Sequence, residues 1–192
     1  DSEVLAGCQA AVEALEAAGT TVIEVDEIFH EDPVMQWIVL WAVARYKAQG
    51  HLIGTADWDL LSTTIQPQIE MGAGITGEQF ARAHDECYRL NWLLEDTFEH
   101  APLILCPSNA GQAPRLGEDG TVNGEAAVGW VRFTYGINMT RNPAGTVCAG
   151  LSKAGTPIGL QVIGRHHAEA SVLAAMATLE DVIGFDGRAV IS

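Results

Sequence analysis

Two side chains with the chemistry of a nucleophile and a base are neighbours in this sequence, Ser152 and Lys153. A serine can attack a carbonyl carbon when a desolvated lysine takes its hydroxyl proton. Adjacent residues on an extended chain point to opposite sides, however, so the amine does not meet the hydroxyl unless the fold brings them together. The pair also lies between Gly150 and Gly155, in a short connection where exposed polar residues are expected. We therefore interpret Ser152-Lys153 as part of a turn.

Cysteines and histidines offer a second kind of chemistry. The pairs Cys148–His166 and Cys106–His100 stay open as nucleophile and base, although nothing in the sequence singles either out. The adjacent histidines 166 and 167 have no carboxylate at ligand spacing, and the four cysteines are scattered, so we expect no metal site. The cysteines fall on apolar stripes, which predicts small buried thiols in a reducing compartment, the cytoplasm.

Composition excludes several classes of partner. The 192 residues hold 25 acidic and 10 basic side chains, for a formal charge of -15. Such a surface repels phosphate backbones and anionic lipid, so we expect neither a nucleic-acid nor a membrane partner. The glycines follow no phosphate-loop or dinucleotide-binding pattern, and we expect no cofactor.

The elements that would position these groups alternate between helical and extended segments, which is typical of an α/β fold. Apolar spacing predicts helices over about residues 2–18, 34–48, 61–72 (bent at Pro67), 76–98, 125–135 and 169–183, and strands over about residues 21–25, 102–106, 145–149 and 157–163. We expect a mixed β-sheet covered by helices. The long connection over residues 107–124 is rich in Gly, Pro, Asn and Asp, and loops of that length are usually functional or mobile.

The stretch INMTRNPAGTVCAGLSKAGTPIGLQVIGR resembles the carboxyl-terminal segment of the amidase signature family. That family shows an asparagine and a proline before a strand, then a glycine, a turn and Gly-Leu-Pro-x-Gly-Leu-Gln with two apolar residues and Gly. The matching residues here are Asn138, Pro143, Gly150, Pro157, Gly159, Leu160, Gln161 and Gly164. The opening helix-glycine-strand and the stretch LILCPSNAGQAP are similar to other parts of the family, so the resemblance covers nearly the whole chain.

The resemblance implies a partial amidase signature fold and hydrolysis of carbon–nitrogen amide bonds through an acyl-serine. The family uses a serine nucleophile, a second serine and a lysine in a Gly/Ser-rich segment that no part of this sequence matches. We therefore assign no catalytic residue. We expect residues 1–192 to be a single α/β unit, the carboxyl-terminal part of a longer chain. It would complete the sheet and part of the cleft for a small-molecule amide, be inactive alone, and need the amino-terminal catalytic portion as its partner.

Candidate substrate-binding residues come from the same resemblance. They are Asn138, Thr140 and Arg141, and the loop after Cys106 is a second candidate wall of the cleft. Arg141 stands where the family usually has glycine. Its guanidinium could bind a substrate carboxylate in a bidentate manner, but an exposed loop arginine is an equally open interpretation.

Four polar or glycine positions carry specific structural expectations. Gly150 and Gly155 should bracket the turn with positive φ, and Gly159 should allow a neighbour to approach the second strand. The amide of Gln161 should be satisfied by pinning an adjacent loop. The alternative to an amidase portion is a stand-alone, non-catalytic α/β binding or scaffold protein. In either case an open sheet edge predicts self-association, so a homo-oligomer is possible.

Overall fold

The computed structural model describes residues 1–185, so residues 186–192 of the expected 1–192 unit lie outside it. The helices are α1 (Ser2–Ala17), α2 (Val34–Gln49), α3 (Gln66–Gly74), α4 (Gly77–Phe98), α5 (Arg132–Thr140) and α6 (Glu169–Ile183), with short 3-10 helices η1 (Gly50–Leu52), η2 (Ala56–Leu60) and η3 (Val128–Val131). The strands are β1 (Leu103–Pro107), β2 (Thr121–Val122), β3 (Glu125–Ala126), β4 (Ala144–Leu151) and β5 (Pro157–Gly164). The expected α/β class is confirmed.

The main sheet has the strand order β1-β5-β4. Both pairings are antiparallel, with Leu103 opposite Gly164 and Ala144 opposite Ile163. Within residues 1–185 the sheet thus contains antiparallel pairs and no parallel pair. The β4–β5 hairpin follows the expected boundaries closely. Its turn has the expected positive φ at Gly150 (136°) and Gly155 (79°).

Alternating residues of β5 place the sheet between two apolar cores. Ile158, Leu160 and Val162 face α1 and α6, and each is at most 4% exposed. Ile163 points the other way and packs against Ile137 of α5 and the last turns of α4. Burial of both faces follows from the near-continuous apolar sequence of this strand.

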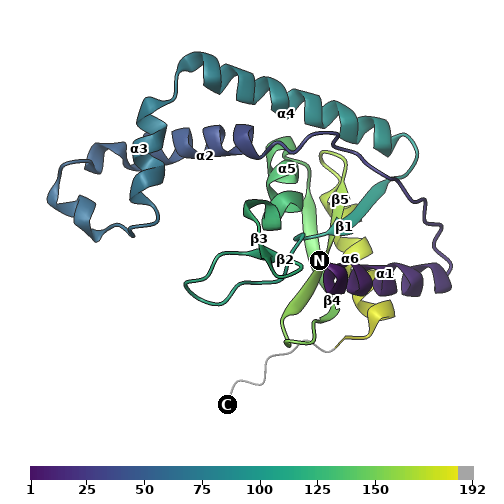
Figure 1. Cartoon of the computed structure of the whole chain (residues 1–192). Helices are drawn as coiled ribbons and strands as arrows, with labels where there is room; N and C mark the ends of the chain where they lie inside the picture. The colour runs from purple at the N-terminus through teal and green to yellow at the C-terminus, as the bar shows by residue number, and fades with distance from the viewer. Residues whose placement is uncertain (186–192) are drawn as a thin grey trace.

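A helical arm made of α2, η1, η2 and α3 projects from the α/β unit (Figure 1). Its two longer helices cross where Gly72 meets Ala42: a Cβ added at Gly72 would lie 2.1 Å from the Ala42 carbonyl oxygen. The chain returns through α4, whose predicted capping box forms. Thr76 Oγ1 accepts from the Gln79 backbone N–H at 3.2 Å, and Gln79 Oε1 accepts from the Thr76 N–H at 2.9 Å.

One predicted strand is absent. Residues 21–25 are irregular, and their apolar side chains Ile23 and Val25 are 57% and 51% exposed. Alternation of side chains suits a strand, but a strand also needs a neighbour for its backbone hydrogen bonds. Among residues 1–185 this segment pairs with no strand, and the main sheet consists of β1, β5 and β4.

Two predicted helices begin later than expected. The segment predicted as a helix from residue 125 opens with the small β2–β3 hairpin, because Asn123 and Gly124 adopt positive φ and turn the chain. Helix α5 begins only at Arg132. Helix α3 begins at Gln66, so Pro67 lies in its first turn and starts the helix instead of bending it.

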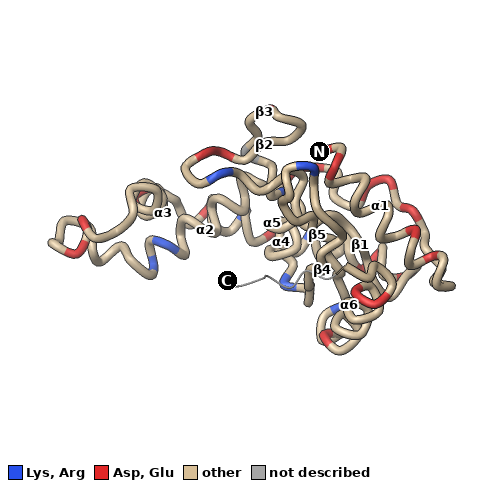
Figure 2. Tube along the Cα trace, turned by 90° about the horizontal axis from the view of Figure 1, so that it is seen from below, with Lys and Arg blue, Asp and Glu red and all other residues tan. Residues whose placement is uncertain are grey.

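Acidic side chains are spread over most elements, with few basic ones between them (Figure 2). No helix within residues 1–185 has the length and apolar character needed to cross a bilayer.

Candidate functional site

The three predicted substrate-binding residues lie together in and just after the last turn of α5. Asn138 and Arg141 are exposed and three positions apart, so they share one side of the helix end. Thr140 is only 1% exposed, and its hydroxyl donates to the Ile137 carbonyl at 2.8 Å. Two of the three side chains can therefore reach a ligand, while the Thr140 hydroxyl is engaged by its own helix.

Arg141 ends α5 in the left-handed conformation, with φ of 60°. This geometry explains why glycine would suit the position, since a Cβ disfavours positive φ. The backbone N–H of Arg141 donates to the Ile137 carbonyl and closes the helix. The Arg141 side chain is exposed at this sharp corner of the chain, and among residues 1–185 it forms no ion pair.

This corner is held by the connection between β5 and α6. Asn142 Nδ2 donates to the Gly164 carbonyl at 2.8 Å, and His166 Nε2 lies 2.9 Å from the Thr140 carbonyl. A carbonyl oxygen only accepts, so His166 carries a hydrogen on Nε2 and donates it. His166 is thus a structural donor here, and no hydrogen bond joins it to Cys148 within the described part of the chain.

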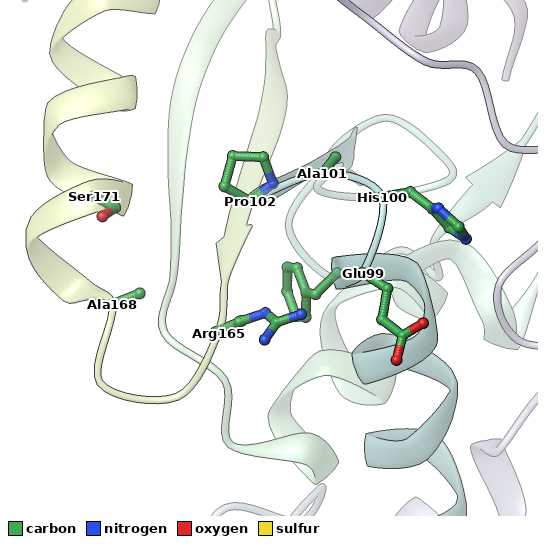
Figure 3. A pocket seen from close by; sticks show the side chains of 8 residues that line it. Glu99, His100, Ala101, Pro102, Arg165, Ala168 and Ser171 are labelled. Carbon is green, nitrogen blue, oxygen red and sulfur yellow. The ribbon is translucent and has the colours of Figure 1, made fainter.

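An open cavity of about 430 Å³ lies beside the β5–α6 connection (Figure 3). Its lining comes from the end of α4, the connection from α4 to β1, the β5–α6 connection and the first turn of α6: Phe98, Glu99, His100, Ala101, Pro102, Arg165, Ala168 and Ser171. The Arg165 guanidinium lies 5.7 Å from the Phe98 ring centroid, and its Nη1 is 3.7 Å from Glu95 Oε2. The cavity therefore offers a cation already engaged by an aromatic ring and a carboxylate.

The second candidate wall, the loop after Cys106, lies at the opposite end of α5. Thr134 in the first turn of α5 donates to the Ser108 carbonyl at 2.8 Å, and Ser108 Oγ is 2.9 Å from Thr146 Oγ1 on β4. Ser108 and Thr146 crowd Gly159, where an added Cβ would lie 2.7 Å from Ser108 Oγ and 2.8 Å from the Thr146 methyl carbon Cγ2. The expected close approach at Gly159 is confirmed.

The two candidate walls therefore do not meet. One lies beside Gly159 and the other beside Gly164, five residues further along β5, or roughly 16 Å at the usual rise of a strand. The hydroxyl groups of Thr134 and Thr146 were not expected at the second candidate wall, the loop after Cys106. The only signals in the sequence are that Thr146 alternates with the apolar Val147 in a strand pattern and that Thr134 stands near the start of a helix.

Ser152 and Lys153 point apart, as a turn requires. Ser152 is 8% exposed and its Oγ lies 2.7 Å from Thr156 Oγ1, whereas the Lys153 side chain is 91% exposed. Lys153 Nζ lies 3.7 Å from Glu3 Oε1. The exposed Lys153 amine therefore faces Glu3, while the Ser152 hydroxyl is engaged by Thr156, so the two groups do not meet. The prediction of a turn is confirmed.

The cysteines are free thiols in largely buried places. Burial raises the pKa of Cys8 to about 11, and burial likewise raises the pKa of Cys106 to about 11. Cys106 Sγ accepts from Gln161 Nε2 at 3.3 Å, and that amide also donates to the Phe133 carbonyl at 3.3 Å. The Gln161 amide is thus satisfied, as expected, but it pins the first turn of α5 to the sheet and not a loop. The raised pKa of Cys106 disfavours this thiol as a nucleophile. No cluster of three potential metal ligands occurs within residues 1–185.

The amidase family model matches residues 1–173. The chain is 29% identical over 194 residues to an acylamidase of Rhodococcus erythropolis, covering 95% of this chain and 39% of that protein. It is 26% identical to a component of the glutamyl-tRNA(Gln) amidotransferase of Neisseria meningitidis, covering 91% of this chain and 40% of that protein. The chain thus spans about two fifths of the length of these relatives.

Solved structures agree in fold. A bacterial aryl acylamidase of the amidase signature family superposes with a TM-score of 0.84 at 21% identity, covering 99% of this chain and 44% of that one. A 6-aminohexanoate cyclic dimer hydrolase in complex with its substrate superposes with a TM-score of 0.79 at 25% identity, covering 98% and 43%. The family model alone covers most of the sequence, and the sheet, its helices and the order of the glycines fit it. The chain belongs to the amidase family.

Proposed function

We propose that this chain forms the part of an amide hydrolase that completes the β-sheet and one wall of the substrate cleft. The observation that carries the proposal is the match of the amidase family model over residues 1–173. In this proposal the serine nucleophile, the second serine and the lysine belong to a separate catalytic portion, because no serine or lysine of this chain matches that motif. The chain alone would be inactive.

The chemistry of the complete enzyme would pass through an acyl-serine. The serine oxygen attacks the amide carbon, the carbon–nitrogen bond breaks, the amine leaves with a proton, and water then hydrolyses the ester. Backbone N–H groups of the catalytic portion would hold the oxyanion. No cofactor takes part in these steps.

The contribution of this chain would be to bind and orient a small-molecule amide. Arg141 and Asn138 would hold a polar or anionic end of the substrate, supported by their shared exposed side of the α5 end. The exposed hydroxyls of Ser108 and Thr146 would form a second polar contact beside Gly159. We place the enzyme in the cytoplasm, a proposal supported by the four free cysteines.

A chromogenic anilide tests the proposal. The purified chain should release no aniline, and mixing it with the serine-bearing portion of the Rhodococcus acylamidase should restore release. Replacing the nucleophilic serine of that portion should abolish it. Turnover by this chain alone that disappears in Ser152→Ala or in Lys153→Ala would overturn the proposal. It would also be overturned if this chain and the serine-bearing portion bound each other but the mixture hydrolysed no anilide. The last result would favour a non-catalytic scaffold.

A further inference from the structure

The outer face of α4 is the exposed aromatic feature of this chain that the proposed cleft does not use. We define it by Asp85, Tyr88, Trp92 and Asp96, which follow one another at helical spacing and are all exposed. Tyr88 is 68% and Trp92 is 72% exposed, although rings of this size usually lose most of their surface to packing. The opposite side of α4 is fully engaged, with Ala83, Leu90, Leu94 and Phe98 buried.

The position of the helix leaves this face open. In Figure 1 α4 runs along the outer edge of the molecule, with α2 and α5 packed against its inner side. Tyr88 and Trp92 are four residues apart, so the two exposed rings lie one helical turn apart in one strip of the helix surface. Exposed aromatic groups gathered on one face are typical of interaction surfaces.

The charges around the strip decide what kind of partner fits. Asp85 and Asp96 flank the rings and form no ion pair within residues 1–185, whereas the two arginines of α4 are each paired within the helix, Arg82 with Glu78 and Arg89 with Glu86. The face therefore presents rings and unneutralised carboxylates. Both attract cations, the rings through their π faces and the carboxylates directly.

A second copy of this chain fits the face poorly. An antiparallel pair of α4 helices with Tyr88 against Trp92 would bring Asp85 of one copy beside Asp96 of the other. The formal charge of -15 on each chain adds a general repulsion. We propose that the outer face of α4 docks a protein segment that carries Lys or Arg side chains around an apolar anchor, such as a basic amphipathic helix.

The test uses a fluorescein-labelled amphipathic peptide built of Leu and Lys, and a matched peptide with Glu in place of each Lys. Fluorescence anisotropy with the whole chain should show binding of the basic peptide and none of the acidic one. The double variant Tyr88→Ala/Trp92→Ala should weaken binding more than about tenfold, because two aromatic anchors are lost. Leu116→Ala removes a fully exposed apolar side chain elsewhere and should leave the affinity unchanged.

A charge variant keeps the test independent of the rings. Asp85→Asn/Asp96→Asn keeps the shape of both side chains and should weaken binding and flatten its dependence on salt. Equal binding by the acidic peptide, or an unchanged affinity in both double variants, would overturn the proposal. A dimer in sedimentation that Trp92→Ala dissolves would also overturn it, because the occupant would then be a second copy. None of these results depends on amide hydrolysis.

Discussion

The α/β unit and the helical arm bury their residues in different ways. The sheet and its helices share a core in which Leu160, Val162 and Leu179 are at most 1% exposed. In the arm, the fully buried contacts are few, at Ala42, Ile69 and Gly72, and apolar side chains such as Leu60 remain 81% exposed.

Buried polar atoms show the same difference. Among residues 1–185, four buried side-chain atoms lack a hydrogen-bond partner, and three of them lie in the arm: Arg45 Nε, Gln49 Oε1 and Gln68 Oε1. An unsatisfied buried polar atom costs stability, as does exposed apolar surface. The α/β unit thus has the larger buried apolar core, whereas the arm relies on a few close contacts.

The largest effect should come from the core of the α/β unit. Leu160→Ala should lower the free energy of unfolding by about 2–5 kcal/mol, because it opens a cavity at the centre of β5. Urea unfolding followed by circular dichroism measures it. Leu173→Ala on α6, which is 64% exposed, is the matched control and should change little. Similar losses in both variants would mean that the sheet does not dominate stability.

The arm should lose stability when a methyl group is added at the close contact between α2 and α3. Gly72→Ala places a methyl group 2.1 Å from the Ala42 carbonyl oxygen and 2.6 Å from Tyr46 Cβ, so α2 and α3 must separate, at a cost of about 1–3 kcal/mol. Hydrogen exchange should accelerate in the arm and stay slow in β5. Gly74→Ala in the same helix has no atom within 4 Å of the new methyl and serves as the control. If hydrogen exchange accelerated equally throughout the chain, the arm and the α/β unit would not be separate regions of stability.

The junction of the two regions depends on Asp32. Its carboxylate accepts from the Tyr135 hydroxyl and from the Val34 N–H at 3.1 Å, and Oδ2 lies 3.3 Å from Arg132 Nη2. Asp32→Ala leaves the buried Tyr135 hydroxyl without its acceptor and should cost about 1–3 kcal/mol. Arm amides next to Trp37, whose ring stacks on Tyr135 at 5.2 Å, should lose protection first.

The same junction should weaken in alkali. Burial, and then the hydrogen bond to Asp32, raise the pKa of Tyr135 above its usual value. A raised folded pKa means that this contribution to stability is complete below the unfolded value of about 10 and is lost as the pH rises beyond it. Denaturant midpoints measured at alkaline pH should fall more in the wild type than in Tyr135→Phe. If the midpoint fell equally with pH in the wild type and in Tyr135→Phe, ionisation of Tyr135 would not be linked to unfolding.

The smallest effect is expected at Lys153. Its ion pair with Glu3 is long and exposed, so Lys153→Ala should leave the unfolding midpoint within error. Ser152→Ala removes a buried hydroxyl bonded to Thr156 and should cost about 1 kcal/mol. If Lys153→Ala lowered the free energy of unfolding as much as Leu160→Ala, the turn would be as important to stability as the core of the sheet.

Much of the fold could be predicted from local sequence signals. The capping box at Thr76, the β4–β5 hairpin and the terminal helix depend on residues within a few positions of one another. The strand predicted over residues 21–25 failed because its alternation carries no information on whether a pairing partner exists. The late start of α5 was missed because the turn at Asn123 and Gly124 competes with helical spacing.

The candidate site could be predicted only in part. The sequence pointed to Asn138, Thr140 and Arg141, but it could not tell that the Thr140 hydroxyl bonds within its own helix. It also could not tell that the loop after Cys106 meets Thr134 at the far end of α5. The first fact depends on the side-chain conformation at the helix end, and the second depends on how α5 lies across the sheet.

By itself, the sequence determined the α/β class, the acidic composition and the turn at Ser152-Lys153, because these follow from composition, order and spacing. The family came from the resemblance of its motifs and from the match of the family model. Only the tertiary structure decided that the two candidate walls stand apart, that Asp32 joins the arm to α5 and that the rings of α4 face outward. These arrangements arise from contacts between residues far apart in the chain, whose geometry no local pattern encodes.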